Sequence, residues 1–459
     1  EISACLVGSE MCIRDRRSYI RDYPSGKLTA SLIGVVNDQG IGSGGLESSL
    51  NSILSGTNGR YVYANGRGNI IPGSEEIRVE AKSGTSIRLT IDRDVQWVAQ
   101  NAISQAVASS RAKSGTVIVM DPKTGEILAQ ASAPTFDPNV PSSITVDKLN
   151  NPSVQEVYEP GSTGKVITVA AAMEEGLITP ETVFSIPYSM KVSDGVFRDH
   201  EKHPTQRLTT TGLLAVSSNT GSIKIGQKLG KDNLYKYLTK FGIGQSTNSK
   251  LPGESAGILH PVKNWSGTSL PTISFGQGYS LTAMQATSVF ATIANNGVRV
   301  KPSILAGVVN ESGKYTPAAA NESTRVLSEQ TAINMRAMME NVVSKNGTAP
   351  SAAINGYRVA GKTGTAERYN TACKCYSGYT ASFIGFAPAD QPKYVVSVTI
   401  QDPKGMHWGG VLAGPVFKKV MGFVLQNQRI SPTPETKTFY SLTEAALKQR
   451  SKITPKSGA

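Results

Sequence analysis

The segment YEPGSTGKVITVAAAM, residues 158–173, decides how the chain is interpreted. A proline and a glycine precede Ser162 and can begin a helix, and the apolar run from Val166 to Met173 can bury it. On such a helix Ser162 and Lys165 lie one turn apart on one face, within hydrogen-bond reach. A serine becomes a nucleophile when a base removes its proton, and lysine serves only if its pKa falls from about 10.4 through burial or a nearby cation. The segment therefore predicts a nucleophilic serine with a lysine base, and it requires a second cation nearby.

Two later motifs supply the remaining groups. Ser217-Ser218-Asn219 follows Ser162, and Lys362-Thr363-Gly364-Thr365 comes much later in the chain. Each tripeptide is weak alone, because Ser-x-x-Lys also occurs at Ser110 and Lys-Thr-Gly at Lys123, where a solvated loop and a β-turn explain them. Their order and setting are informative: a helix start, a loop between helices, and a strand with glycine where a substrate must approach the backbone.

The composition is that of an ordinary globular protein. Of 459 residues, 39% are hydrophobic and 18% charged, which excludes a disordered, collagenous or disulfide-framework chain. The net charge is +13, but the basic residues are scattered and form no block interleaved with aromatic residues, as a nucleic-acid groove would need. An anionic membrane leaflet or cell wall suits such a charge equally well. No apolar run approaches the roughly 18 residues of a membrane span.

The cysteines and histidines show no metal-binding spacing. Cys5 and Cys12 stand far from Cys373 and Cys375, so we expect no structural zinc and no other metal or cofactor. The pair Cys373/Cys375 can close a short disulfide or remain two free thiols. No G-x-S-x-G elbow accompanies the histidines, so we expect them to be ordinary surface residues and not members of a catalytic triad. The histidines are His200, His203, His260 and His407.

Patterning along the chain predicts two domains. Residues 1–16 show neither periodicity nor capping pattern, and we expect them to be an unassigned lead-in, either an artefact or a frayed terminus. Residues 23–81 are glycine-rich with short β-type runs at 32–36, 61–63 and 70–71, which predicts a small, extended, β-rich domain. A strand at 86–91 ends in Asp92, which can cap an amphipathic helix spanning residues 95–107.

The larger domain has strands at both ends and helices between. We expect strands at 116–120 and 126–131, helical segments over 161–238, 282–295 and 329–343, and strands at 357–360, 380–386 and 394–401. This order predicts one α+β domain whose sheet is closed by distant segments. The predicted division is a lead-in at 1–16, part of the small domain at 17–86, the large domain at 87–428, and a tail at 429–459 with a weak helix near 442–449.

The three motifs resemble those of the penicillin-binding proteins and serine β-lactamases, whose signature is S-x-x-K, S-x-N and K-T-G. Further segments make the chain similar to a class B penicillin-binding protein over roughly residues 23–428. The run Ser377–Phe386 and the preceding Cys373/Cys375 resemble the division-specific transpeptidases of actinobacterial type. The resemblance implies an antiparallel sheet flanked by helices, a helical subdomain and a truncated β-rich pedestal. The further segments are Gly45-Leu-Glu, Leu89-Thr-Ile-Asp, Gly125-Glu-Ile-Leu-Ala, Glu159-Pro-Gly-Ser, Phe275-Gly-Gln-Gly-Tyr and Phe386-Ala-Pro-Ala-Asp.

The resemblance also implies catalytic roles. Ser162 would attack the penultimate D-Ala carbonyl of a D-Ala-D-Ala stem peptide, and Lys165 would take its proton. Ser217 would relay that proton to the departing amine, Asn219 would orient Lys165 and hold the peptide amide, and Lys362 would keep Lys165 neutral. An amine from a neighbouring stem peptide would then complete a cross-link, whereas a β-lactam would stall as an acyl-enzyme.

The strand motif would bind the substrate. Thr363 and Thr365 would hydrogen-bond the terminal carboxylate beside Gly364, and the backbone N–H groups of Ser162 and Thr365 would form an oxyanion hole. Gly164 departs from the family, which often has phenylalanine there, and a glycine inside a helix costs about 1 kcal/mol.

The implied role is septal cell-wall synthesis during division. The implied partners are stem peptides, β-lactams as covalent inhibitors, a membrane glycosyltransferase and other division proteins, without nucleic acid. The implied location is the extracytoplasmic face of the plasma membrane, with an N-terminal anchoring helix missing from this chain. The alternatives are a D,D-carboxypeptidase, which uses water as acceptor, and a β-lactam sensor or scaffold of the same fold. A β-lactamase is disfavoured, because no E-x-x-L-N segment follows Ser217 and the pedestal would be superfluous.

Overall fold

A five-stranded antiparallel sheet forms the centre of the molecule, in the strand order β16-β17-β18-β4-β5. The computed structural model describes residues 20–66, 69–370, 373–433 and 440–453, so the expected lead-in at 1–16 lies outside the described residues. The strands of this sheet are β4 (Ser114–Met120), β5 (Ile127–Ala133), β16 (Ala360–Asn370), β17 (Cys375–Ala387) and β18 (Tyr394–Gln401).

Segments from opposite ends of the domain close this sheet, as predicted. Strand β18 pairs with β4, with Val396 opposite Val119. Nearly every residue of β4 and β18 is buried, which is typical of strands covered on both faces. Strand β16 lies at the edge, so among the described residues one side of its backbone has no neighbouring strand in this sheet.

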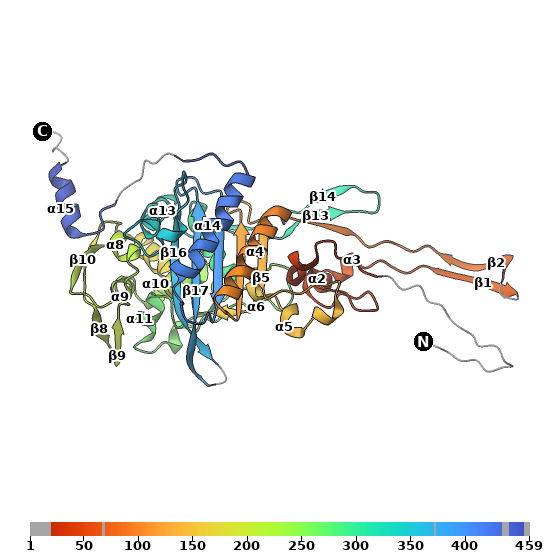
Figure 1. Cartoon of the computed structure of the whole chain (residues 1–459), viewed down its shortest axis with the longest axis horizontal. Helices are drawn as coiled ribbons and strands as arrows, with labels where there is room; N and C mark the ends of the chain where they lie inside the picture. The colour runs from red at the N-terminus through yellow and green to blue at the C-terminus, as the bar shows by residue number, and fades with distance from the viewer. Residues whose placement is uncertain (1–19, 67–68, 371–372, 434–439, 454–459) are drawn as a thin grey trace.

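Helices cover both faces of the sheet (Figure 1). Helices α4 (Arg93–Ser109) and α14 (Gly409–Asn427) pack on one face and α12 (Ala283–Ala294) on the other. The carboxylate of Asp92 accepts the first free N–H groups of α4, which confirms the predicted cap.

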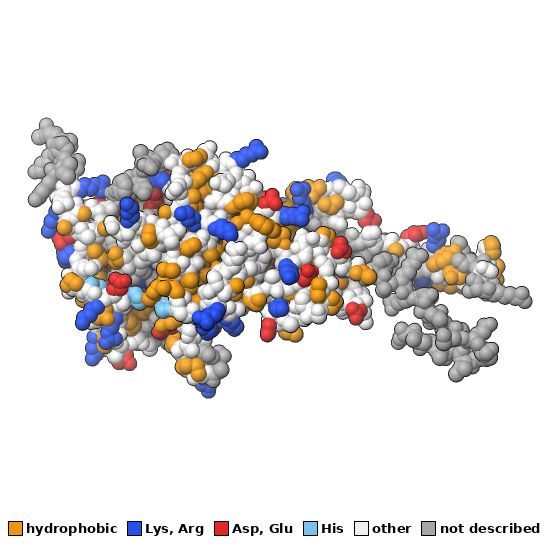
Figure 2. Space-filling view, in the orientation of Figure 1, with side chains coloured by type: hydrophobic (Ala, Val, Ile, Leu, Met, Phe, Trp, Pro, Cys, Tyr) orange, Lys and Arg blue, Asp and Glu red, His pale blue; other side chains and the backbone are white. Residues whose placement is uncertain are grey.

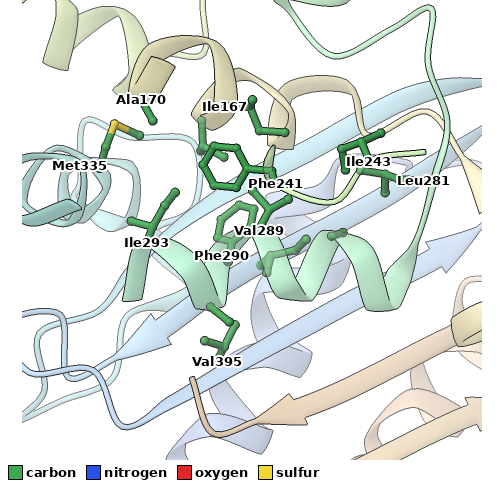
Figure 3. Packing of buried hydrophobic residues seen from close by; sticks show 14 of the residues in the cluster. Ile167, Ala170, Phe241, Ile243, Leu281, Val289, Phe290, Ile293, Met335 and Val395 are labelled. Carbon is green, nitrogen blue, oxygen red and sulfur yellow. The ribbon is translucent and has the colours of Figure 1, made fainter. Parts of the chain in front are cut away.

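A hydrophobic core lies on each side of the sheet. Figure 3 shows Val289 and Phe290 of α12 packed among apolar side chains that include Val395 of β18. On the opposite side, Phe383 of β17 meets Phe417 of α14 edge to face, with ring centroids 4.8 Å apart.

A helical subdomain lies beside the sheet edge that β16 forms. Its helices are α7 (Lys165–Glu174), α8 (Thr210–Ala215), α9 (Asn219–Leu229), α10 (Lys231–Lys240), α11 (Ser269–Ser274) and α13 (Glu329–Val343). The expectation that helices dominate residues 161–238 is wrong for its middle part, because residues 183–209 form four short strands. In β8 and β9 the exposure of side chains alternates with a period of two, which favours strands over helices. These strands are β7 (Val183–Ile186), β8 (Ser189–Val192), β9 (Gly195–Arg198) and β10 (Gln206–Thr209).

The N-terminal region ends in a long arm. Strands β1 (Arg60–Gly66) and β2 (Asn69–Val79) form an antiparallel hairpin that projects away from the sheet (Figure 1). The predicted strand at 32–36 is wrong, because α1 (Ala30–Ile33) forms there and ends at Gly34, whose φ is +83°. Two short helices follow it, α2 (Gly45–Ser49) and α3 (Asn51–Leu54).

The remaining elements connect these parts. They are β3 (Ser86–Leu89), β6 (Val157–Tyr158), β11 (Leu281–Thr282), β12 (Val298–Val300), β13 (Leu305–Val309), β14 (Tyr315–Pro317), β15 (Ser323–Arg325), α5 (Val146–Leu149) and α6 (Pro152–Gln155). Short 3-10 turns lie at Gly26–Leu28, Pro141–Ser143, Gly161–Thr163, Val262–Asn264 and Pro350–Ala352.

The C-terminal segment returns to the helical subdomain. Helix α15 (Glu444–Ile453) confirms the weak helix expected there, and before it the Leu442 carbonyl accepts a hydrogen bond from the backbone N–H of Thr209. The domain limits at 86 and 428 stay predictions.

Two surface features complete the fold. Lys and Arg side chains are distributed along the face that Figure 2 shows. Within the described ranges, no helix is both long and apolar enough to cross a bilayer.

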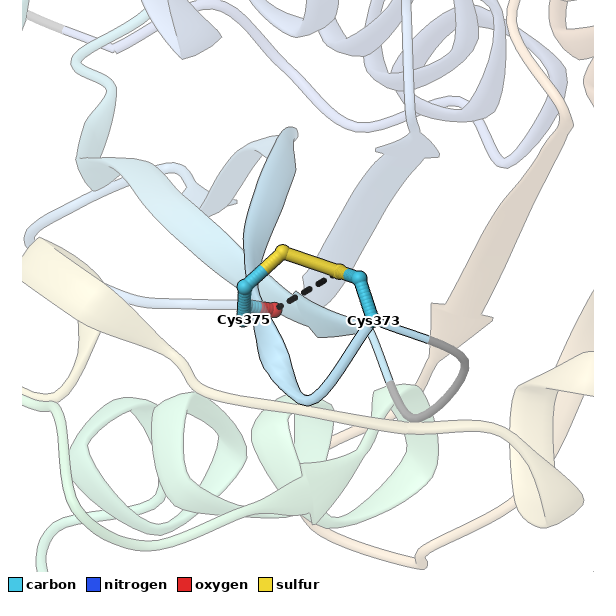
Figure 4. Close-up of a disulfide and its surroundings, with 2 residues drawn as sticks. All are labelled: Cys373 and Cys375. Atoms are coloured by element: carbon cyan, nitrogen blue, oxygen red, sulfur yellow. Dashed lines mark hydrogen bonds between the residues drawn. A yellow bond between two sulfur atoms is a disulfide. The ribbon is translucent and has the colours of Figure 1, made fainter.

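Cys373 and Cys375 are joined by a disulfide near the tip of the β16–β17 hairpin, which decides between the two alternatives left open by the sequence (Figure 4).

Candidate active site

A cleft of about 670 Å³ lies where strand β16 faces the helical subdomain. All three sequence motifs meet there. Ser162, Ser217, Asn219, Thr363 and Thr365 line the cleft. The two motif lysines lie beneath this lining, with no solvent exposure.

Ser162 lies in the 3-10 turn Gly161–Thr163, and Gly164 separates this turn from the start of α7. Gly161 has a φ of +53°, and a Cβ added there would lie 2.9 Å from the Cβ of Ala366 on β16. The backbone N–H of Gly161 donates to the Gly276 carbonyl at 2.8 Å. Within the described part of the chain, the Ser162 hydroxyl has no hydrogen-bond partner, so it is free to face the cleft.

Lys165 points at the second motif. Its Nζ donates to the Ser217 carbonyl oxygen at 2.5 Å and to Asn219 Oδ1 at 2.7 Å, and lies 3.2 Å from Ser217 Oγ. The sequence placed Ser162 Oγ within hydrogen-bond reach of Lys165, but no hydrogen bond joins them in the structure. The reason is geometric, because the turn at Ser162 precedes α7 and Ser217 approaches from another loop.

Ser217 occupies a strained position between the two lysines. Its φ of +62° is uncommon for a residue with a side chain, and such strain is concentrated at functional sites. Lys362 Nζ lies 2.8 Å from Ser217 Oγ and also within 3.3 Å of Thr363 Oγ1. The single hydroxyl proton of Ser217 can therefore be given to one lysine while its oxygen accepts from the other.

Both lysines ionise with difficulty. Burial lowers the pKa of Lys165 to about 7, although Asp199 acts in the opposite direction. Burial and the neighbouring Lys165 lower the pKa of Lys362 well below its usual value. Two buried cations this close cannot both stay charged near neutral pH, so the pair shares about one proton.

Sequence reasoning missed Asp199. This residue follows strand β9, and its carboxylate accepts from the Ser218 hydroxyl at 2.7 Å and from the backbone N–H groups of Asn219 and Thr220 at 2.5 and 2.9 Å. It therefore fixes the start of α9, which carries the second motif. No local sequence signal marks Asp199, because the four-residue strand β9 before it is too short to be told from a helix by its pattern.

Asn219 has a fixed side-chain orientation. Its Oδ1 accepts from Lys165, and its Nδ2 donates to the Arg198 carbonyl oxygen at 2.9 Å. With both ends of the amide occupied, Asn219 holds Lys165 in place.

The third motif lies along the edge strand. Thr363 Oγ1 lies 2.8 Å from Thr348 Oγ1, and Thr365 Oγ1 accepts from the Gly409 N–H at 3.2 Å. Thr348 also lines the cleft and is a second residue that the sequence did not identify. At Gly364 a Cβ would collide with Ser382 and approach the Pro160 carbonyl, so packing within the protein also requires this glycine.

Two histidines expected to be ordinary surface residues line the cleft instead. The ring of His200 contacts that of Trp408, with centroids 4.2 Å apart, and so joins the helical subdomain to the loop before α14. His203 Nε2 lies 3.1 Å from Asp199. Burial works to lower the pKa of His203, but its bonds to the Pro204 carbonyl and to Asp199 outweigh this and raise it.

Gly164 makes room for a tyrosine. The hydroxyl of Tyr279, which is 2% exposed, occupies the space that a Cβ at Gly164 would need. Among the described residues this hydroxyl has no hydrogen-bond partner. The hydroxyl of Tyr279 thus fills space that a larger residue at 164 would need.

The described residues contain no group of three or more His, Cys, Asp or Glu side chains that could hold a metal ion. What the cleft offers is a serine hydroxyl facing solvent, a buried lysine pair that shares one hydroxyl, and an edge strand beside them. These are the parts of serine acyl transfer with a lysine base.

Comparisons with known proteins agree with this chemistry. Residues 115–422 match the family described as penicillin binding protein transpeptidase domain. The chain is 40% identical over 441 residues to penicillin-binding protein PbpB of Mycolicibacterium smegmatis, covering 94% of this chain and 67% of that protein. It is 34% identical to peptidoglycan D,D-transpeptidase FtsI of Escherichia coli, covering 90% of this chain and 68% of the relative.

A solved structure is also similar. Penicillin binding protein 3 of Mycobacterium tuberculosis, complexed with aztreonam, superimposes with a TM-score of 0.84 at 36% identity and covers 92% of this chain and 93% of that one. The chain spans about two thirds of the length of the curated relatives described above.

Proposed function

Because the chain belongs to the class B penicillin-binding proteins, and within them to the type of the septal peptidoglycan D,D-transpeptidases, we propose that it cross-links stem peptides through an acyl-enzyme on Ser162. The observation that carries this proposal is the buried pair of lysines that share the Ser217 hydroxyl beside an unbonded serine in one cleft. The proposed substrates are a D-Ala-D-Ala donor and an amine acceptor, both from stem peptides.

In the first step Ser162 Oγ forms a bond to the carbonyl carbon of the penultimate D-Ala. Its proton passes to Lys165, and the bond to the terminal D-Ala breaks as the departing amine receives a proton through Ser217. Lys165 must be neutral to act, and burial lowers its pKa to about 7, so the neutral base is accessible at neutral pH. In the second step the acceptor amine attacks the ester, loses a proton to the same relay and regenerates Ser162.

The other motif residues position the donor. The free edge of β16 suits an extended peptide that adds as a further strand. We assign the terminal carboxylate to Thr363 and Thr365, which lie beside Lys362. The backbone N–H groups of Ser162 and Thr365 would stabilise the oxyanion that develops during attack.

The proposed setting is the extracytoplasmic side of the plasma membrane at the division septum. A membrane glycosyltransferase and other division proteins are the proposed partners, and β-lactams are the proposed covalent inhibitors. The structure of penicillin binding protein 3 with aztreonam, at 36% identity, supports the last of these.

The test is the intact mass of the protein after incubation with benzylpenicillin. We expect one adduct on the wild type that persists for hours and is lost in Ser162→Ala. A folded wild type without any adduct would contradict the proposal, and an adduct that vanishes within minutes would indicate a β-lactamase.

Turnover separates the transpeptidase from its alternatives. With a D-Ala-D-Ala donor and an amine acceptor, we expect a cross-linked product as well as released D-Ala. Release of D-Ala without the product would indicate a carboxypeptidase. Acylation without any turnover would indicate a sensor or scaffold.

A further inference from the structure

A second cavity lies apart from the active site. Its volume is about 280 Å³, and it shares no lining residue with the first cleft. Three segments form its wall: the loop after α10, the start of α12, and strand β12 with the residues that follow. The sequence and the proposed mechanism assign no role to this place.

The charge that lines this cavity is entirely positive. Arg299 and Lys301 are among the lining residues, and no Asp or Glu is. Lys301 is neutralised by an exposed ion pair with Glu322 at 2.6 Å. Arg299 therefore supplies the positive charge of the cavity lining that no ion pair neutralises among the described residues.

Arg299 is half-buried and has no counter-charge. Its guanidinium lies against the backbone of Gly242, where a Cβ would collide with it. Among the described residues it makes no hydrogen bond and no ion pair, and burial lowers its pKa without any acidic neighbour to offset the effect. A guanidinium in this state normally costs stability, because its five donors have lost water without gaining acceptors.

Glu254, which does not line the cavity, binds the loop after α10. Glu254 accepts from the backbone N–H and hydroxyl of Thr247 and from those of Ser249, all within 3.1 Å. These bonds stiffen the loop that forms one wall. The loop then presents Ser246 and Asn248 to the same cavity, and both side chains can donate hydrogen bonds.

We propose that this cavity is a second binding site, which takes an oxyanion, a phosphate or a carboxylate, on Arg299. The planar guanidinium can donate two parallel hydrogen bonds to such a group, and the hydroxyl and amide donors of the loop complete its coordination. A cavity of about 280 Å³ is smaller than the usual drug-sized site, so it fits the charged end of a longer molecule better than a whole ligand. The source is either a free small anion or an anionic group carried on a cell-wall polymer.

The first experiment measures thermal unfolding of the full chain against inorganic phosphate. Chloride keeps the ionic strength constant, so that screening does not contribute. We expect Tm to rise and saturate for the wild type and for the control Lys418→Met, which removes one exposed charge on α14. For Arg299→Met we expect at least a tenfold loss in apparent affinity, with a Tm in chloride that is equal to or above that of the wild type.

Two results would overturn the proposal: an Arg299→Met protein that responds to phosphate as the wild type does, or a wild type whose Tm does not saturate. If Arg299→Met does not fold, Arg299→Lys decides the matter. It keeps the charge and loses the planar fork, so we expect several-fold weaker binding, and wild-type affinity would contradict the assignment.

Further arms distinguish the sources. Acetate replaces phosphate as a carboxylate probe, and binding of a soluble muropeptide is compared between Ser162→Ala protein, which cannot be acylated, and the same protein with Arg299→Met added. Binding of the muropeptide that depends on Arg299 indicates a polymer-borne anion, whereas a response to phosphate or acetate alone indicates a free anion. A response to none of the three rejects the site. These readouts do not require acylation, so they stand or fall separately from the proposed transpeptidase reaction.

Discussion

Removing the charge of Lys362 should move the pH dependence of acylation. Lys165 Nζ and Lys362 Nζ both contact Ser217 Oγ, at 3.2 and 2.8 Å, so they lie at most about 6 Å apart. At an effective dielectric constant of about 20, two positive charges at that distance repel by about 3 kcal/mol, which corresponds to about two pH units. If Lys165 is the base and Lys362 keeps the proton, loss of Lys362 raises the pKa of Lys165, because the repulsion that disfavours its charged form is gone.

The expected profile follows from that sign. Acylation requires neutral Lys165, so the wild-type rate should rise with pH, with a midpoint near 7. In Lys362→Met the midpoint should move to higher pH, by at most about two pH units. In Lys362→Arg, which keeps the charge, it should stay near 7 even if the maximal rate falls.

The assay is the second-order rate of benzylpenicillin acylation between pH 5.5 and 10, with circular dichroism at each pH as the folding control. A Lys362→Met midpoint that stays near 7 would refute the reasoning, because burial alone would then set the pKa of Lys165. A wild type without a rise near 7 would show that Lys165 is not the base.

Three further predictions concern Asp199, Gly164 and the core. Asp199→Asn should lower the free energy of unfolding by about 1–3 kcal/mol, because the bonds of Asp199 to the start of α9 are lost. It should also move the midpoint of acylation to lower pH, because Asp199 raises the pKa of Lys165. Urea denaturation measures the first effect and the pH profile of acylation the second, and a midpoint that moves to higher pH would contradict the prediction. Gly164→Ala should lower the free energy of unfolding by about 1–3 kcal/mol, because its Cβ would collide with the Tyr279 hydroxyl. Tyr279→Phe should leave the free energy of unfolding unchanged, because among the described residues that hydroxyl has no hydrogen-bond partner. Thermal unfolding of both variants and of the double variant checks this, and a destabilised Tyr279→Phe would show that the hydroxyl makes a hydrogen bond. Phe417→Ala should lower the free energy of unfolding by about 3–5 kcal/mol, because it leaves a cavity beside Phe383 at a fully buried position. Urea denaturation measures this, and a loss below about 1 kcal/mol would mean that neighbouring side chains move to fill the cavity.

Much of the active site could be predicted from the sequence, because its chemistry is concentrated in three short motifs. Ser162, Ser217 and Lys362 come together as expected, although they are far apart along the chain. The hydrogen bond between Ser162 and Lys165 that helical spacing predicts does not form, since the turn at Ser162 lies outside α7. The burial that lowers the pKa of Lys165 depends on all the elements packed around it, so it could not be predicted from the sequence near Lys165.

The fold was predictable where periodicity was long and failed where elements were short. The cap at Asp92 and the closure of the sheet by its last strands follow directly from pattern. The four strands between residues 183 and 209 are each four residues long, and runs of that length are ambiguous between strand and helix. Asp199 was missed for the same reason, because its importance arises only after those strands fold back onto α9.

The pairing of β4 with β18 has a consequence for biosynthesis. Met120 meets Val395, which is translated about 275 residues later, so the centre of the sheet cannot close until β18 has been made. Until then β4 and β5 exist as an apolar hairpin with an open edge, a species that a holding chaperone would have to shield. Lys362 also arrives on β16, in the last third of the chain. Covalent capture of a fluorescent penicillin by nascent chains would therefore time the completion of folding, since truncated intermediates lack half of the machinery that reacts with it.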